Sequence, residues 1–160
     1  MNMISNWKYV KSGLVLSVTL LLPGYGVGSN VQPTTYPTIT LATSATYIAE
    51  NYGATVTLTA TASQLADEDI IVTLASSGAA TNGTDYSSLG DQTITISAGS
   101  VTGTITATPT DDTIYEGSET AIISISAVSG GNASENGTQS VTITITDDEY
   151  DLFKHLYQKP

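Results

Sequence analysis

Acidic residues are concentrated in one short stretch of the sequence, TPTDDTIYEGSETA at 108–121. Four carboxylates lie there within nine residues: Asp111, Asp112, Glu116 and Glu119. No lysine or arginine occurs between Lys11 and Lys154. Two like charges about 4 Å apart repel by roughly 4 kcal/mol at the effective dielectric found near a protein surface. A folded chain must therefore separate these carboxylates, protonate them or neutralise them with a cation from outside.

The composition limits the functions that this chain can have. Its 160 residues are enough for one domain with short extensions, and its formal net charge is −11. The four basic residues all lie near the termini, at Lys8, Lys11, Lys154 and Lys159. An anionic body repels phosphate, which excludes nucleic acid as a partner. The chain has no cysteine, and its single histidine, His155, lies near the C-terminus, which excludes disulfides, thiolate sites, histidine-based triads and imidazole zinc sites.

The N-terminal residues have the features of a secretory signal. Two lysines precede the apolar run GLVLSVTLLL at 13–22, and small residues follow it. These features predict a signal peptide over 1–28 and a linker over 29–36. An uncleaved membrane anchor is the alternative, but the run is shorter than the roughly 20 residues that a bilayer-spanning helix needs. The predicted location is therefore secreted or cell surface, with membrane attachment only if this segment is retained.

Apolar and hydroxyl residues alternate along most of the chain between 37 and 149. In TVTLTATA at 55–62 every second residue is apolar, which is the period of a strand with one buried face. Seven such runs are expected to be strands: 39–48, 54–62, 70–76, 92–98, 101–108, 120–128 and 140–147. They predict an all-β, seven-stranded, immunoglobulin-like antiparallel β-sandwich over 37–149. The tail at 150–160 stays open between a short helix, a linker and a disordered end.

Most of the acidic residues follow odd-numbered members of this strand series. Because successive antiparallel strands alternate in direction, the ends of odd-numbered strands lie at one pole of the sandwich. Nine carboxylates therefore converge there: Glu50, Asp85, Asp111, Asp112, Glu116, Glu119, Asp147, Asp148 and Glu149. Calcium accepts about six to eight oxygen ligands in flexible geometry, so the pattern predicts a calcium site. The alternative, acidic loops that only aid solubility, gives no reason to favour one pole.

Four segments of the sequence, in order, resemble the Calx-beta domain. They are AENYG at 49–53, GAATNGTDY at 78–86, DDTIYEGSET at 111–120 and ITDDE at 145–149, and the resemblance covers about 39–149. It implies that more than one Ca²⁺ binds at one end of a seven-stranded sandwich. The ligands that it implies are Glu50, Asp85, Asp111, Asp112, Glu116, Glu119, Asp147 and Asp148. Glu149 departs from the family pattern, which usually ends in a third aspartate, and its longer side chain changes the outermost site.

Three classes of function fit these residues. The first is a calcium-binding module with a structural, adhesion or interaction role, whose partners are neighbouring domains or surface proteins. The second is a carbohydrate-binding sandwich, although the only tryptophan, Trp7, lies in the predicted signal and leaves no tryptophan platform for sugar. The third is a small hydrolase in which Glu116 and Glu119 would act as acid and base. A small sandwich offers little groove for catalysis, so we expect the calcium-binding module and not an enzyme.

Overall fold

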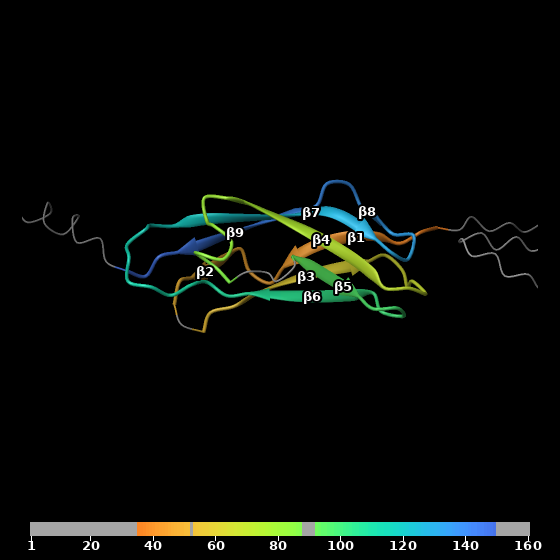
Figure 1. Cartoon of the computed structure of the whole chain (residues 1–160), viewed down its shortest axis with the longest axis horizontal. Helices are drawn as coiled ribbons and strands as arrows, with labels where there is room; N and C mark the ends of the chain where they lie inside the picture. The colour runs from red at the N-terminus through yellow and green to blue at the C-terminus, as the bar shows by residue number, and fades with distance from the viewer. Residues whose placement is uncertain (1–34, 52, 88–91, 150–160) are drawn as a thin grey trace, which may run out of the picture. The chain divides into compact units, whose positions relative to one another are not determined.

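The computed structural model describes residues 35–51, 53–87 and 92–149 (Figure 1). These residues form nine strands and no helix: β1 (Thr38–Thr43), β2 (Tyr47–Ala49), β3 (Val56–Ala62), β4 (Ile70–Gly78), β5 (Thr93–Ile96), β6 (Thr102–Ala107), β7 (Glu119–Ser129), β8 (Ser134–Glu135) and β9 (Ser140–Thr146). Within them no helix is long and apolar enough to cross a membrane. The predicted signal, most of the linker and the tail lie outside the described residues.

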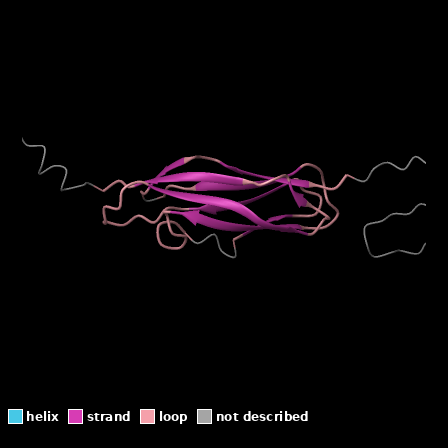
Figure 2. Cartoon of the chain, turned by 90° about the horizontal axis from the view of Figure 1, so that it is seen from above, coloured by secondary structure: helices cyan, strands magenta, loops and turns pink. Residues whose placement is uncertain are grey.

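The strands form two sheets that face each other (Figure 2). One sheet has the order β6-β3-β1-β8, and the other has the order β2-β9-β7-β4-β5. This arrangement confirms the expected all-β sandwich. The alternation seen in the sequence explains it, because one face of each strand packs inward and the hydroxyl-rich face points outward.

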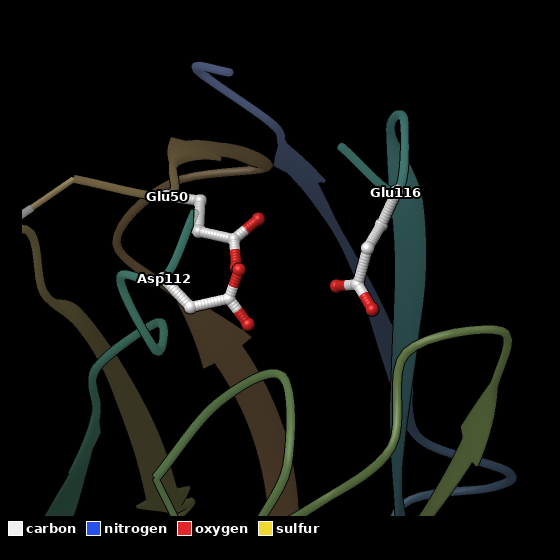
Figure 3. A group of neighbouring side chains, drawn as sticks. All are labelled: Glu50, Asp112 and Glu116. Atoms are coloured by element: carbon white, nitrogen blue, oxygen red, sulfur yellow. The ribbon is translucent and has the colours of Figure 1, made fainter. Parts of the chain in front are cut away.

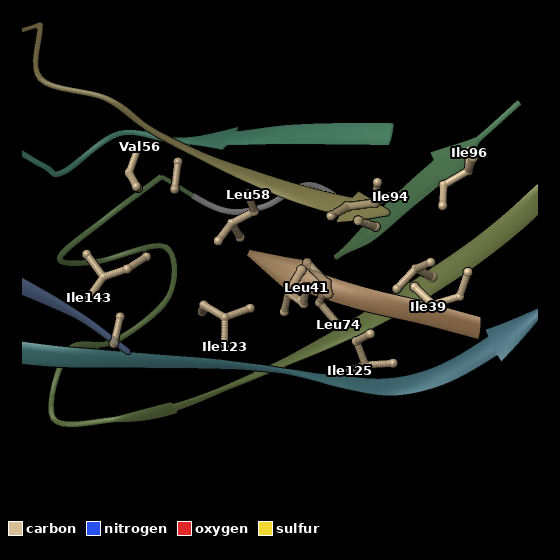
Figure 4. Close-up of a cluster of buried hydrophobic side chains, with 14 of the residues drawn as sticks. Ile39, Leu41, Val56, Leu58, Leu74, Ile94, Ile96, Ile123, Ile125 and Ile143 are labelled. Carbon is tan, nitrogen blue, oxygen red and sulfur yellow. The ribbon is translucent and has the colours of Figure 1, made fainter. Parts of the chain in front are cut away.

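The core lies between the two sheets (Figure 4). Along β3 every second residue is buried, and the threonines between them are half-buried. The largest side chains that are almost completely buried come from five strands of both sheets: Ile39, Leu58, Ile70, Val72, Ile94, Ile96 and Ile123. Aliphatic side chains therefore hold the sandwich together and fix the positions of the loops at its ends.

The first expected strand, 39–48, is not continuous. It divides into β1, which pairs with β3, and β2, which pairs in parallel with β9 in the other sheet. Ser44 marks the crossing: its N–H donates to Thr57 O at 2.9 Å, and its hydroxyl accepts from Thr57 N at 2.9 Å. The short β8 also pairs in parallel, with β1. The described strands therefore number nine, and two of their pairings are parallel.

The registers bring several strand ends to one end of the sandwich. Ala49 lies opposite Thr146, so β2 and β9 end together. Gly78, the end of β4, lies opposite Ala121 near the start of β7, and the end of β6 lies opposite the start of β3. We call this end the acidic pole, comprising Glu50, the loops 79–87 and 108–118, and residues 147–149. The opposite pole comprises 63–69, 97–101 and 130–139.

Candidate metal centre

Glu50 lies at the base of the acidic pole. It directly follows β2, and its N–H donates to Thr146 O at 2.8 Å, which continues the pairing of β2 with β9. Its side chain is only 4% exposed, and among the described residues it is the only buried charged residue. Burial and nearby carboxylates raise its pKa from 4.5 to about 7. These carboxylates are Asp112, Glu116, Asp147 and Glu149.

Glu50 forms one group with two acids of the β6–β7 loop. One carboxylate oxygen each of Glu50, Asp112 and Glu116 lies within 4.8 Å of the other two. Figure 3 shows the Glu50 side chain and the two side chains of the loop extending toward a common space. The pKa of Glu116 is raised as well, mainly by burial and then by the charges of neighbouring aspartates. We call this group the inner triad.

A second group lies where the β6–β7 loop meets the end of β9. It contains Asp111, Asp148 and Glu149, which again place one carboxylate oxygen each within 4.8 Å of one another. The Glu149 Oε2 atom is buried and has no hydrogen-bond partner. An unsatisfied buried polar atom costs about 1–3 kcal/mol, so this oxygen is suited to a ligand. We call this group the outer triad.

Asp147 positions the loops that carry both triads. Its Oδ2 accepts hydrogen bonds from the N–H groups of Glu116 and Gly117, each at 2.5 Å, and its Oδ1 accepts from Glu149 N at 2.8 Å. Burial alone would raise the pKa of Asp147, but these three backbone donors and a side-chain hydrogen bond with Glu149 together lower it. Asp147 therefore stays ionised and fastens the end of β9 to the β6–β7 loop.

Asp85 and Glu119 form a carboxyl pair beside the inner triad. Asp85 accepts a hydrogen bond from Thr81 N at its Oδ2, at 2.6 Å, which holds the loop after β4. Glu119 is the first residue of β7. Its pKa is raised mainly by burial, and then by the charge of Asp85 and a side-chain hydrogen bond with Asp85. Neither residue belongs to a triad, but their proximity adds negative charge to the same pole.

The nine predicted ligands thus divide into distinct groups. Six belong to the two triads, while Asp85, Glu119 and Asp147 lie beside them. Their assignment as metal ligands stays a prediction. The sequence reasoning missed Asn82, whose Oδ1 is buried without a hydrogen-bond partner in the loop that carries Asp85. An Asn-Gly pair is typical of any turn, so the sequence held no signal for this oxygen.

Most of the chain matches the model of a known protein family. The family model of the Calx-beta domain matches residues 33–149. The chain belongs to the Calx-beta domain family. This is a family of calcium-binding β-sandwich modules, and the match confirms the resemblance found in the four acidic segments.

Two solved structures share the Calx-beta fold. The apo-form Calx CBD1 domain is 18% identical with a TM-score of 0.54, and the match covers 70% of this chain and 99% of that one. The CBD12 structure from CALX1.2 is 18% identical with a TM-score of 0.52, and the match covers 65% of this chain and 41% of that one. The chain thus spans less than half of the CBD12 structure, and these identities show the fold alone. Among curated proteins no significant match was found.

The donor set of this Calx-beta domain fits a hard divalent cation. Every member of both triads offers carboxylate oxygen, and the sequence has no lysine, arginine or histidine between Lys11 and Lys154 that could balance the charge. Oxygen-only sites favour calcium, magnesium or manganese over softer metals. The buried Glu50 carboxylate and the unpaired Glu149 Oε2 are the two observations that a bound cation would explain.

Proposed function

We propose that this Calx-beta domain binds calcium at its acidic pole and that each triad holds one ion. The observation that carries the proposal is Glu50, a buried acid surrounded by carboxylates in a domain without a cationic side chain. A buried carboxylate must be protonated or paired with a cation, and here that cation must come from solution. Calcium suits loops of variable reach better than magnesium, which demands near-octahedral geometry.

Calcium would join parts of the chain that are far apart in sequence. The inner triad connects the end of β2 with the β6–β7 loop, and the outer triad connects that loop with the end of β9. Neutralising the carboxylates would stiffen this pole, while the packed strands need no ion. The domain would then serve as an interaction or adhesion module whose surface at one pole is ordered by calcium. The carboxylates have no catalytic role in this proposal.

The predicted signal peptide supports an extracellular setting for this activity. Free calcium is abundant outside cells, where extracellular modules bind it with dissociation constants of about 10⁻⁴ to 10⁻³ M. Secretion or cell-surface display is therefore part of the proposal, with neighbouring domains or surface proteins as partners.

Thermal unfolding of the chain with and without calcium tests the proposal. A ligand that binds only the folded state adds about 2.7 kcal/mol at a hundredfold excess over its dissociation constant, so the melting temperature should rise. Titration calorimetry should give more than one ion per chain, and magnesium should produce a smaller shift. An unchanged melting temperature in millimolar calcium, together with no heat of binding, would rule out the proposal.

A further inference from the structure

Two apolar side chains project from the acidic pole. Ile114 is 61% exposed and Tyr115 is 47% exposed, and both belong to the loop between β6 and β7. Figure 1 shows this loop bending around the end of the sandwich, beyond the ends of the strands. Two adjacent apolar side chains are therefore exposed on a charged loop at one end of the sandwich.

This pair differs from the other large apolar residues that are exposed. The remaining ones are not consecutive in sequence, although Leu65 and Val101 lie on neighbouring loops of the opposite pole: Tyr36, Tyr47, Leu65, Val101 and Ile122. Single exposed apolar residues are normal on a protein surface and need no explanation. Ile114 and Tyr115 are consecutive, and they lie between Asp112 and Glu116, two members of the inner triad.

The carboxylates hold the backbone of this tip. Asp112 Oδ1 accepts from Ile114 N at 2.7 Å, and Asp147 Oδ2 accepts from the N–H groups just beyond Tyr115, at Glu116 and Gly117. Figure 3 shows Asp112 and Glu116 reaching inward from the two limbs of the same loop. Asp112 and Glu116 thus face Glu50, and Glu116 is exposed like the two apolar side chains that precede it. A cation bound by the triad would fix the tip in this form.

We propose that Ile114 and Tyr115 insert into an anionic phospholipid surface when calcium occupies the acidic pole, a proposal that rests on the calcium binding proposed above. Without calcium the carboxylates repel anionic headgroups. With calcium, headgroup phosphate and carboxylate oxygens complete the coordination of the ions, since these are the hard donors that calcium prefers. Tyrosine suits the interface, where its ring lies in apolar surroundings and its hydroxyl stays in water.

The size of the tip favours a lipid surface over a protein partner. A stable protein interface buries about 1,200–2,000 Å² in total, which two side chains on one loop do not supply. A membrane needs no shape complementarity, and peripheral binding commonly combines shallow apolar insertion with electrostatic attraction to anionic lipids.

Vesicle sedimentation tests this proposal on the whole chain. In calcium the protein should sediment with vesicles of phosphatidylcholine mixed with phosphatidylserine, stay in solution with phosphatidylcholine alone, and be released by chelator. The double variant Ile114→Ala/Tyr115→Ala should bind the mixed vesicles roughly tenfold or more weakly, because it removes the inserted apolar surface. Calorimetry without lipid should show the same calcium affinity for this variant as for the unmodified chain.

Leu65→Ala is the matched control, because Leu65 is 62% exposed but lies at the opposite pole. It should leave vesicle binding unchanged. Equal losses in both variants, or equal binding to both vesicle types, would overturn the proposal. Calcium bound by calorimetry with no sedimentation, or calcium-induced association of the chain with itself in place of lipid binding, would overturn it while leaving the calcium site intact. A chain that binds no calcium would overturn both proposals.

Discussion

Both poles of the sandwich carry aspartates and glutamates, but these carboxylates have different partners at the two poles. At the opposite pole Asp69 Oδ1 accepts from Ala98 N at 2.8 Å, and Glu135 Oε1 accepts from Gln139 N at 2.5 Å. The Asp69 carboxylate joins two loops, and the Glu135 carboxylate closes a turn. At the acidic pole most carboxylates face other carboxylates, and Glu50 is buried among them.

The difference shows that the partner of a carboxylate, and not its charge alone, indicates a metal site. An acid that faces a free backbone N–H is satisfied within the protein. An acid that faces other acids is not, and the raised pKa values of Glu50 and Glu116 express this conflict. At the acidic pole Asp85 and Asp112 also accept from one backbone N–H each, and at Asp147 three such donors help to lower the pKa.

The largest expected effect is on calcium affinity at the acidic pole. Asp112→Asn should weaken binding by roughly 10–100-fold or more, since even residues that only support metal ligands have effects of that size. The asparagine keeps an oxygen that accepts from Ile114 N, so the turn is retained. Calorimetry measures the effect, with Asp67→Asn, an exposed acid at the opposite pole, as the control. Equal losses in both variants would show that general acidity binds the ion.

A smaller effect concerns the pH dependence of the metal-free protein. The pKa of Glu50 is 4.5 without the fold and about 7 within it, so the folded state binds more protons between these values. Protonated Glu50 therefore makes its full contribution to the free energy of unfolding below about pH 4.5, and this contribution is lost as the pH rises through about 7. Urea unfolding of calcium-free protein should therefore show a falling midpoint across this window.

The variant Glu50→Gln isolates this contribution, because glutamine resembles the protonated acid. Its midpoint should change less across the same pH window and exceed that of the unmodified chain at pH 8, although it binds calcium more weakly. A parallel pH dependence in the variant and the unmodified chain would contradict the role given to Glu50.

The smallest effect is expected at the opposite pole. Asp69→Ala removes the acceptor for Ala98 N and should lower the free energy of unfolding by about 1 kcal/mol, with calcium affinity unchanged. Glu68→Ala, at an exposed neighbouring position, should change neither quantity. Chemical denaturation and calorimetry on the two variants measure this contrast. A loss of calcium affinity in Asp69→Ala would remove the distinction between the poles.

Much of the fold was predictable because its cause is local. Alternation of apolar and hydroxyl residues, as in 55–62, marks strands with one buried face, and the positions of the loops follow from strand direction. The break at Ser44 was not predictable from this pattern. Small and hydroxyl residues surround it and mark no clear end of a strand, and the change of sheet depends on Thr57 and β9, which are distant in sequence.

The candidate site was predictable as a set of residues but not as an arrangement. Spacing indicates which acids share a pole, and six of these acids lie together in the two triads. The division into two triads depends on which loop carboxylates face each other. The role of Asp147 depends on the backbone donors of Glu116 and Gly117, which become available only after the β6–β7 loop has formed its turn.

The parallel pairing of β2 with β9 has a mechanical consequence. Tyr36 lies before β1 at the opposite pole, while Glu149 follows β9 at the acidic pole. A pull applied at these two residues drives β2 and β9 in opposite directions along their length, so their hydrogen bonds are sheared together and do not open one by one. Ions that tie the β6–β7 loop to Glu50 and to the residues after β9 would lie at the end of this shear path. Calcium concentration would then set the force that the domain withstands.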